Sequence, residues 1–389
     1  MMIIATTILL LFIIKSLVYL LSIVLNRGVV TVKRNSRKHI NKVAVIIPVY
    51  KEEKIIKNTI EYFKGIKADV YYVSTIREGK RTKNSTYQLI RESVVGGKAL
   101  FYGGGQAKSG QINQALRHLY SLDKYSYIGI FDADSRPDKN VFEYIRSNQL
   151  NADILQMPSR YYDNYTTISL LNKANAVFQT RWSLCYELPQ WRKWQTKKSY
   201  APLMYLVGHG LFISAERKFY FPEDTIAEDL YFGYSMSLDN NSIFVLPFFD
   251  NCTVPEKYTL NIIQSSRWFY GELILPKIMT KYKLTVNRLI AFVVRYTQIL
   301  QWMLGPIMVL ICVIYSFTTF SIWLMVLSML GIVIYCVALP TLSVTRTMRL
   351  NVFFYLAYIL KSIINCMGPL LCVYKQLLHK NEIFIKTER

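Results

Sequence analysis

The stretch Tyr127-Ile-Gly-Ile-Phe131-Asp132-Ala-Asp134-Ser-Arg-Pro-Asp138 predicts how this chain folds. It begins with an apolar run, which is typical of a strand buried on both faces of a parallel sheet. Asp132 and Asp134 follow directly, at the strand end where open α/β sheets bind their ligands. Both carboxylates can reach one hard cation, and such a cation can bridge the two phosphates of a nucleotide sugar. The simpler alternative is a turn in which an aspartate caps the backbone.

The chain around this stretch predicts one α/β domain over residues 43–285. Apolar runs that indicate buried strands alternate with stretches of helical pattern, and this alternation is typical of βαβ units and a mostly parallel sheet. The expected strands are 43–48, 70–74 and 127–131, and the expected helices are about 52–64 and 110–121. Residues 166–196 mix large apolar side chains with Lys and Arg. They predict either an amphipathic helix on a membrane or acceptor groove, or an ordinary packed helix.

Both ends of the chain are apolar enough to suggest membrane segments. Residues 2–25 can cross a bilayer as a helix, and a basic cluster at 27–42 follows, which places the next domain in the cytoplasm by the positive-inside rule. Residues 298–317 and 319–339 predict two more spans, and 351–374 a weaker third. We therefore divide the chain into an anchor (1–26), a catalytic domain (43–285), membrane segments with two or three spans plus an interfacial helix (289–374), and a basic tail (375–389).

The net charge of +22 favours anionic partners. Since the chain has expected membrane spans and no nucleic-acid module, we assign this charge to anionic lipid and phosphate-bearing substrates rather than to nucleic acid. The six cysteines form no C-x-x-C pair, so a disulfide framework or a zinc site is not expected. We interpret them as small buried side chains.

Two further motifs carry candidate chemistry. Ala227-Glu228-Asp229-Leu230 places carboxylates where one can take the proton of an acceptor hydroxyl, although acidic residues also stabilise helix N-termini. Gln264-Ser-Ser-Arg267-Trp268 combines a planar cation, an aromatic stacking face and an amide, which suits a sugar beside a diphosphate. A helix with an exposed Arg and a buried Trp is the alternative.

These motifs, in this order and between apolar ends, resemble the family-2 glycosyltransferases. They are similar to the membrane-integrated branch that includes cellulose, chitin and hyaluronan synthases. The resemblance implies a GT-A fold, a Rossmann-like nucleotide-sugar-binding domain with a mostly parallel sheet, flanked by N-terminal and C-terminal transmembrane helices. It implies a metal on Asp132 and Asp134, with Asp132 also on the donor diphosphate. It further implies Asp229 as the catalytic base beside Glu228.

The resemblance also implies the donor site. A turn that contacts the nucleotide stands here as Pro48-Val-Tyr50-Lys-Glu52, and the Q-x-x-R-W motif matches at Gln264, Arg267 and Trp268, with Trp268 also bordering the acceptor. A Gly/Lys-rich segment at 103–113 offers Lys108 to a phosphate. Two features depart from the family pattern: Glu78 is the only carboxylate in the turn after the second strand, and Gly208-His209-Gly210 replaces a Gly-Ser-Gly-like turn. His209 either contacts the metal or acceptor or has no function.

We therefore predict an inverting hexosyl- or N-acetylhexosaminyltransferase that uses Mg²⁺ or Mn²⁺ and a nucleotide-diphosphate sugar, with a UDP-sugar expected. Its acceptor is a polysaccharide or a lipid-linked saccharide in cell-surface or capsular polysaccharide synthesis. Processive addition and single addition to a lipid-linked acceptor both remain open. The expected location is a bacterial plasma membrane with the catalytic domain in the cytoplasm. A membrane transporter or lipid-binding protein without catalysis is the alternative from another class.

Overall fold

The structure is a computed structural model that describes residues 1–26, 41–79, 85–94, 96–104, 108–196, 202–345 and 348–378. Several predicted features lie outside the described residues. These are the basic cluster apart from Lys42, residues 105–107 of the glycine-rich segment, and the basic tail from residue 379 onward.

The main sheet has seven strands in the part of the chain that the structure describes, in the order β3-β2-β1-β4-β8-β6-β9. Neighbouring strands from β3 to β4 run parallel, as do β6 and β9, whereas β8 is antiparallel to both of its neighbours. The strands are β1 (Val43–Pro48), β2 (Asp69–Thr75), β3 (Ala99–Tyr102), β4 (Tyr127–Ile130), β6 (Ile154–Gln156), β8 (Leu211–Ser214) and β9 (Ile243–Val245). The predicted α/β fold with a mostly parallel sheet is confirmed, and β1, β2 and β4 correspond to the three expected strands; β3, β6, β8 and β9 were not predicted.

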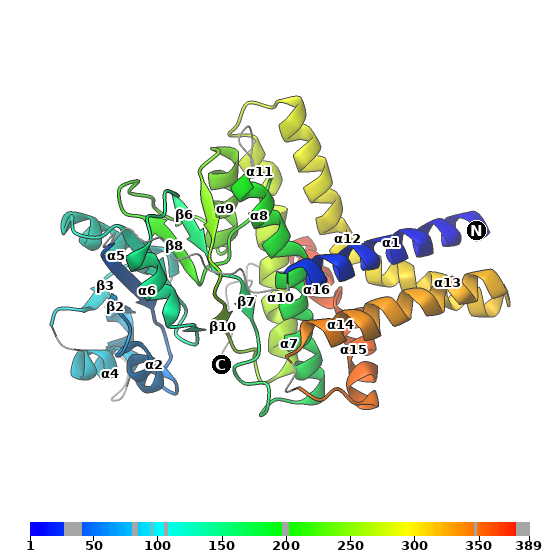
Figure 1. Ribbon diagram of the computed structural model, residues 1–389, viewed down its shortest axis with the longest axis horizontal. Helices are drawn as coiled ribbons and strands as arrows, with labels where there is room; N and C mark the ends of the chain where they lie inside the picture. Colours follow the sequence, from blue (N-terminus) through cyan, green and yellow to red (C-terminus); the bar gives the residue numbers. More distant parts are fainter. Residues whose placement is uncertain are drawn as a thin grey trace.

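The sheet is covered on both faces because its strands alternate between two cores. In β1, Ala44 and Ile46 pack into one core with α5, while Val45 and Ile47 pack into another with α2 and α6. Figure 1 shows these helices around the sheet. The helices of this region are α2 (Ile56–Phe63), α3 (Ile76–Gly79), α4 (Thr86–Ser93), α5 (Lys108–Ser121) and α6 (Asn140–Ser147). Predicted helix 52–64 therefore begins four residues late, at Ile56.

A second, three-stranded sheet joins distant parts of the chain beside the end of β4. Its order is β5-β10-β7, formed by β5 (Arg136–Pro137), β7 (Ser159–Arg160) and β10 (Asp250–Asn251). Asn251 pairs with Arg136 and Asp250 with Ser159. The small sheet therefore carries residues 250–253 to the Asp132–Asp134 turn.

A long helical stretch from 170 to 196 connects the sheet to the apolar helices. It consists of α7 (Leu170–Trp182), a π-helical turn η1 (Ser183–Glu187) and α8 (Leu188–Thr196). Arg181 and Trp191 are fully buried, and α7 packs against α15 while η1 packs against α1. Residues 170–196 are thus a packed helical stretch, and α7 also lines the cavity described below.

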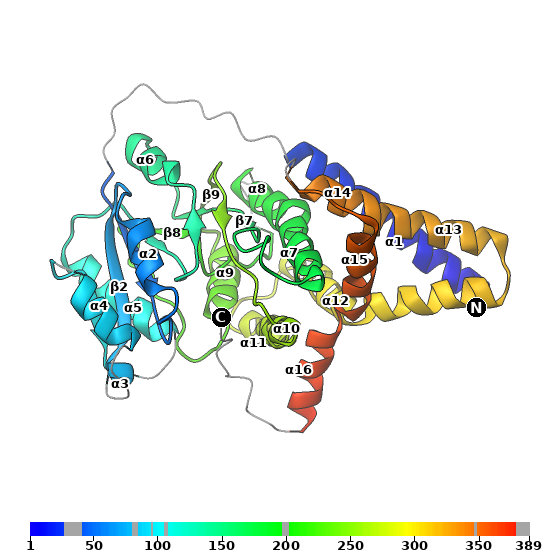
Figure 2. The same cartoon turned by 90° about the horizontal axis from the view of Figure 1, so that it is seen from below.

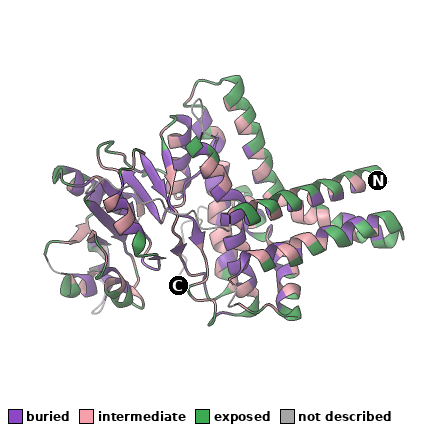
Figure 3. Cartoon of the chain, in the orientation of Figure 1, coloured by how far each residue is buried: buried purple, intermediate pink, exposed green. Residues whose placement is uncertain are grey.

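Among the residues that the structure describes, four helical segments are long and apolar enough to cross a membrane: Met2–Asn26, Val286–Thr318, Ile322–Ser343 and Val352–Leu377. They comprise α1 (Met2–Asn26), α12 (Val286–Thr318), α13 (Ile322–Ile332), η2 (Val333–Ala338), α14 (Leu339–Ser343), α15 (Val352–Ile364) and α16 (Met367–Leu377). In Figure 2, α1 and α13 extend side by side away from the sheet, and Figure 3 shows that their outer faces are exposed. The chain therefore presents a large apolar surface at this end.

The last apolar segment differs from the others because it is divided. α15 ends at Ile364, α16 begins at Met367, and Figure 2 shows α16 running away from the α1–α13 pair. α16 packs instead on α10 (Tyr258–Leu273), where a Cβ on Gly368 would lie 2.4 Å from the Cβ of Ser265. The predicted third span is thus two helices, one of which packs on the helix that carries the Q-x-x-R-W motif.

Candidate active site

One cavity of about 1440 Å³ joins the carboxyl edge of the main sheet to the apolar helices. Its lining includes Pro48 at the end of β1, Tyr50 and Glu52 in the turn that follows, and residues 132–134 after β4. It also includes the start of α9 (Glu228–Leu238) and residues from α1, α7, α10 and α12. Nearly all of the candidate residues from the sequence therefore meet in a single space.

At the sheet side of this cavity, Lys108 holds the first aspartate of the D-x-D pair. The Lys108 Nζ donates to Asp132 Oδ1 at 2.7 Å and to the Gly208 carbonyl at 3.0 Å. Burial opposes the charge of this lysine, but Asp132, Glu228 and Asp229 outweigh that effect and raise its pKa. A cation therefore lies beside Asp132 where a diphosphate would also need one.

The second aspartate is held by a residue from the small sheet's end. Asp134 is 6% exposed, and its Oδ2 accepts a hydrogen bond from the Thr253 hydroxyl at 2.6 Å. This hydrogen bond fixes one carboxylate oxygen of Asp134. Thr253 belongs to no recognisable sequence motif, and only the tertiary fold identifies it as a partner of Asp134.

His209 faces the same region from the loop before β8. Its Nδ1 lies 2.9 Å from Asp250 Oδ2 and 3.5 Å from the Cys252 Sγ, and the three side chains could together hold a metal ion. Burial lowers the pKa of His209, but the hydrogen bond to Asp250 and the charge of Asp132 raise it overall. The mixed nitrogen, oxygen and sulfur donors suit a softer metal than the all-oxygen pair Asp132 and Asp134.

Asp229 is positioned by backbone groups at the start of α9. Its Oδ2 accepts from the Gly208 N–H at 2.9 Å, and a Cβ on Gly208 would lie only 2.7 Å from the same oxygen. Glycine is therefore required at 208 for this close approach. Neighbouring Glu228 is 8% exposed, and burial together with the charge of Asp229 raises its pKa to about 7.

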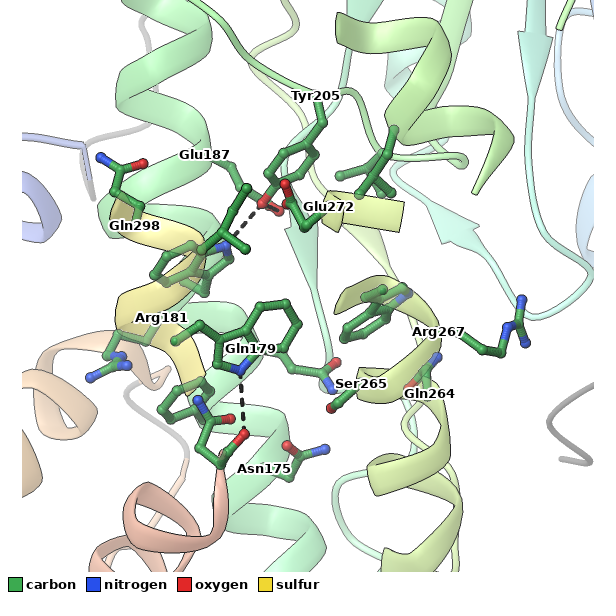
Figure 4. A pocket seen from close by; sticks show the side chains of 18 of the residues that line it. Asn175, Gln179, Arg181, Glu187, Tyr205, Gln264, Ser265, Arg267, Glu272 and Gln298 are labelled. Atoms are coloured by element: carbon green, nitrogen blue, oxygen red, sulfur yellow. Dashed lines mark hydrogen bonds between the residues drawn. The ribbon is translucent and has the colours of Figure 1, made fainter. Parts of the chain in front are cut away.

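The Q-x-x-R-W motif lies on α10, across the cavity from α7. Gln264 and Trp268 line the cavity, and Gln264 Oε1 is buried with no hydrogen-bond partner among the described residues. Figure 4 shows Gln264 and Ser265 opposite Asn175 and Gln179, with Arg267 pointing away from them. Arg267 also lines the cavity, and its charge reaches Glu228. The motif thus contributes to two sides of the space.

One candidate donor residue does not face the cavity. Glu78 is 5% exposed and accepts hydrogen bonds from the Lys51 N–H at 3.0 Å and the Ser74 hydroxyl at 3.3 Å. Burial raises the pKa of its carboxyl. It therefore fixes the turn after β1, which carries Tyr50 and Glu52, rather than lining the cavity itself.

Sequence reasoning missed a buried polar network that joins α12 to the catalytic helices. Arg295 forms an ion pair with Glu272 on α10, and its Nε donates to the Tyr234 hydroxyl on α9 at 2.8 Å. Nearby, the Tyr205 hydroxyl donates to Glu187 Oε1 at 2.7 Å, and Figure 4 shows these two side chains together. An arginine within an apolar helix was the available signal, because such residues are costly and rarely without a partner.

The comparison with protein families identifies the chain. The model of "Glycosyl transferase family group 2" matches residues 127–348, more than half of the sequence. The chain belongs to this glycosyltransferase family. A comparison with curated proteins found no sequence that matches this chain.

One solved structure agrees with the fold of this glycosyltransferase. A mannosyltransferase from Pyrobaculum calidifontis, solved with GDP-mannose and Mn²⁺, is 13% identical with a TM-score of 0.56, and the match covers 96% of this chain and 99% of that one. S. aureus TarS 1–349 is 14% identical with a TM-score of 0.41, covering 86% and 91% of the two chains. At these identities the first likeness shows the fold alone, and it includes the apolar helices.

Proposed function

We propose that this glycosyltransferase moves a sugar, with inversion, from a nucleotide-diphosphate donor to a saccharide hydroxyl at a membrane surface. The observation that carries the proposal is the position of Asp229 in the cavity that also holds Asp132, Lys108 and Trp268. Family membership favours transfer over the transporter alternative. A single displacement fits one carboxylate base facing an acceptor.

The residues of the chain divide the reaction between them. Asp229 takes the proton of the acceptor hydroxyl while the hydroxyl oxygen attacks the anomeric carbon. The bond from that carbon to the diphosphate breaks, and its electron pair leaves with the diphosphate. Lys108 and Arg267 offer positive charge to the leaving group. The side chains of Gln264 and Trp268 orient the acceptor sugar by hydrogen bonding and stacking.

The cavity also fits a divalent metal at Asp132 and Asp134. Two carboxylates from one turn supply the hard oxygen ligands that Mg²⁺ and Mn²⁺ prefer, and Lys108 shows that this place attracts a cation. When bound, the metal would offset the negative charge that develops on the diphosphate. The mannosyltransferase that shares the fold was solved with Mn²⁺ and a nucleotide sugar, which supports the same donor class here.

The helices support a topology with three crossings. α1, α12 and the α13–α14 segment would span the membrane, whereas α15 and α16 pack against α7 and α10 and would lie at the surface. After these three crossings, the chain is on the same side of the membrane as the domain that follows α1. The basic cluster at 27–42 and the basic tail then both lie in the cytoplasm, which satisfies the positive-inside rule.

The test is nucleotide diphosphate release by the purified full-length protein, across a panel of nucleotide sugars, with and without Mg²⁺ or Mn²⁺. We expect metal-dependent release with one donor. Asp229→Asn should lower release on the order of 10²–10⁴-fold, as is usual for loss of a general base, while donor binding by calorimetry is retained. The matched control is Asp239→Asn, which changes an exposed aspartate at the other end of α9. Normal turnover in Asp229→Asn would refute the assigned base.

A further inference from the structure

The half of the cavity farthest from the sheet is lined by aliphatic side chains of the apolar helices. Ile8 and Phe12 come from α1, Leu304, Met308 and Val313 from α12, and Ile332 from α13. A saccharide chain would meet few hydrogen-bonding groups along this wall. A hydrocarbon chain would bury apolar surface there, which is favourable in proportion to the area removed from water.

Three cations line the cavity where this apolar half begins. They are Lys15 on α1, Arg181 on α7 and Lys361 on α15, and we refer to them as the basic cluster of the cavity. Arg181 is 1% exposed and Lys361 is 4% exposed. The charge of Arg181 acts on both lysines, so the three lie within electrostatic reach of one another.

The hydrogen-bond partners of these cations are neutral. Arg181 donates to the Tyr335 hydroxyl at 3.0 Å, Lys361 donates to Asn365 Oδ1 at 2.6 Å, and Lys15 donates to the amide of Gln301. Arg181 also lies 4.4 Å from the ring centres of Phe178 and Tyr335. Within the described part of the chain, no carboxylate pairs with any of the three, and the Nε and one terminal nitrogen of Arg181 have no acceptor.

Three clustered cations without an opposite charge destabilise the folded protein. Aromatic rings and neutral acceptors stabilise a buried cation in part, but they provide no opposite charge. Three like charges gathered in a region of low dielectric repel one another. The same charges become favourable when an anion with several acceptor oxygens enters, because charge-assisted hydrogen bonds are roughly twice as strong as neutral ones. The basic cluster of the cavity therefore indicates a site for a phosphate group.

We propose that the acceptor is a saccharide carried on a lipid diphosphate. Its hydrocarbon chain lies along the aliphatic wall, its diphosphate binds the basic cluster of the cavity, and its saccharide reaches Asp229 and Gln264. This inference rests on the proposed function. The acceptor hydroxyl loses its proton to Asp229, its oxygen bonds to the donor's anomeric carbon, and the nucleotide diphosphate leaves, while the lipid diphosphate is unchanged.

The experiment measures binding of farnesyl diphosphate to the detergent-purified full-length protein by calorimetry, with EDTA present. Farnesol has the same chain without phosphate, and inorganic diphosphate has the phosphates without the chain. We expect farnesyl diphosphate to bind at least about tenfold more tightly than either. Arg181→Gln and Lys361→Met should each weaken that binding about tenfold or more, because each removes a charge-assisted contact.

The controls separate charge from folding and from the donor site. Lys173→Gln lies on α7 outside the cavity lining and should leave binding within about twofold, and Arg181→Lys should retain most of it. Equal binding of farnesol would overturn the proposal, as would tighter binding of inorganic diphosphate. Loss of binding in Lys108→Gln but not in Arg181→Gln would place the diphosphate at the donor site and also overturn it. Since the readout is binding without a donor, failure of this inference is distinct from failure of nucleotide diphosphate release.

Discussion

The two halves of the cavity differ in how their charges are balanced. At the sheet side, basic side chains have carboxylate partners: Lys108 pairs with Asp132, and His209 contacts Asp250. At the helix side, Arg181 and Lys361 have only neutral partners among the described residues. On the sheet side Lys108 and His209 therefore already have carboxylate partners, and a donor with its metal must exchange existing partners. The helix side retains a positive charge that a ligand can balance.

The largest effect should come from the metal ligands of the sheet side. Asp132→Asn removes a carboxylate and also frees Lys108 from its ion pair, so we expect transfer to fall on the order of 10³-fold, consistent with the several kcal/mol that a bound metal supplies. Chelation of the wild-type protein should have the same effect and should be reversed by added Mn²⁺ or Mg²⁺. The measurement is nucleotide diphosphate release.

The control for this change is Asp138→Asn. Asp138 follows β5, a few residues after the Asp132–Asp134 turn; it is exposed and accepts a hydrogen bond from the Asn140 N–H, so its change to Asn should leave the rate within about twofold. Unchanged metal dependence in Asp132→Asn would show that the metal binds elsewhere. The group formed by His209, Asp250 and Cys252 would then be the next site to change.

A smaller effect is expected when the base is displaced rather than removed. In Gly208→Ala the new Cβ would lie 2.7 Å from Asp229 Oδ2, so the carboxylate must move. Since misplacement of about 1 Å can cost on the order of 10²-fold, the turnover number should fall about 10–100-fold with donor affinity unchanged. Gly65→Ala is the control, because its Cβ would meet nothing closer than 3.8 Å. Equal loss in both variants would indicate general destabilisation instead.

The sequence predicted the sheet side better than the helix side. Asp132 and Asp134 could be placed because the carboxyl ends of parallel strands meet at one edge, and the structure brings them near Lys108 and Asp229. Thr253 and Asp250 could not be placed, since they reach the turn through a small sheet formed by strands more than 100 residues apart. Such pairings depend on tertiary structure and leave no local pattern.

On the helix side, apolar composition predicted helices but not their arrangement. Residues 351–374 have the length of a span, yet the structure divides them at Asn365 and packs α16 on α10. Gly368 permits this close approach, but a glycine in an apolar helix has the same appearance in a sequence whether it packs or not. Arg181 was part of a segment judged only by amphipathic pattern, which cannot show that its charge faces a cavity.

The smallest effect concerns the carboxyl beside the base. The pKa of Glu228 is raised to about 7 by burial and by Asp229, so Glu228 ionises as the pH passes neutrality. The ionised Glu228 adds negative charge beside the acceptor site, which favours removal of the acceptor's proton. We expect the transfer rate to rise a few-fold between pH 6 and pH 8 in the wild type, and Glu228→Gln to remove that rise.

The folding stability should depend on pH with the opposite sign to the transfer rate. Because the pKa of Glu228 is higher in the folded state than its ordinary value of 4.5, the folded protein binds the extra proton between about pH 4.5 and pH 7. Stability therefore falls as the pH rises through that window and is level above it. Glu228→Gln should lose this slope and be more stable at pH 8, by on the order of 1–3 kcal/mol. Glu216→Gln, at an exposed position, should keep the wild-type slope. If the rise in transfer rate and the fall in stability both persist in Glu228→Gln, another group on the sheet side titrates in this range. His209 would be the candidate, and its partner Asp250 would be the residue to change.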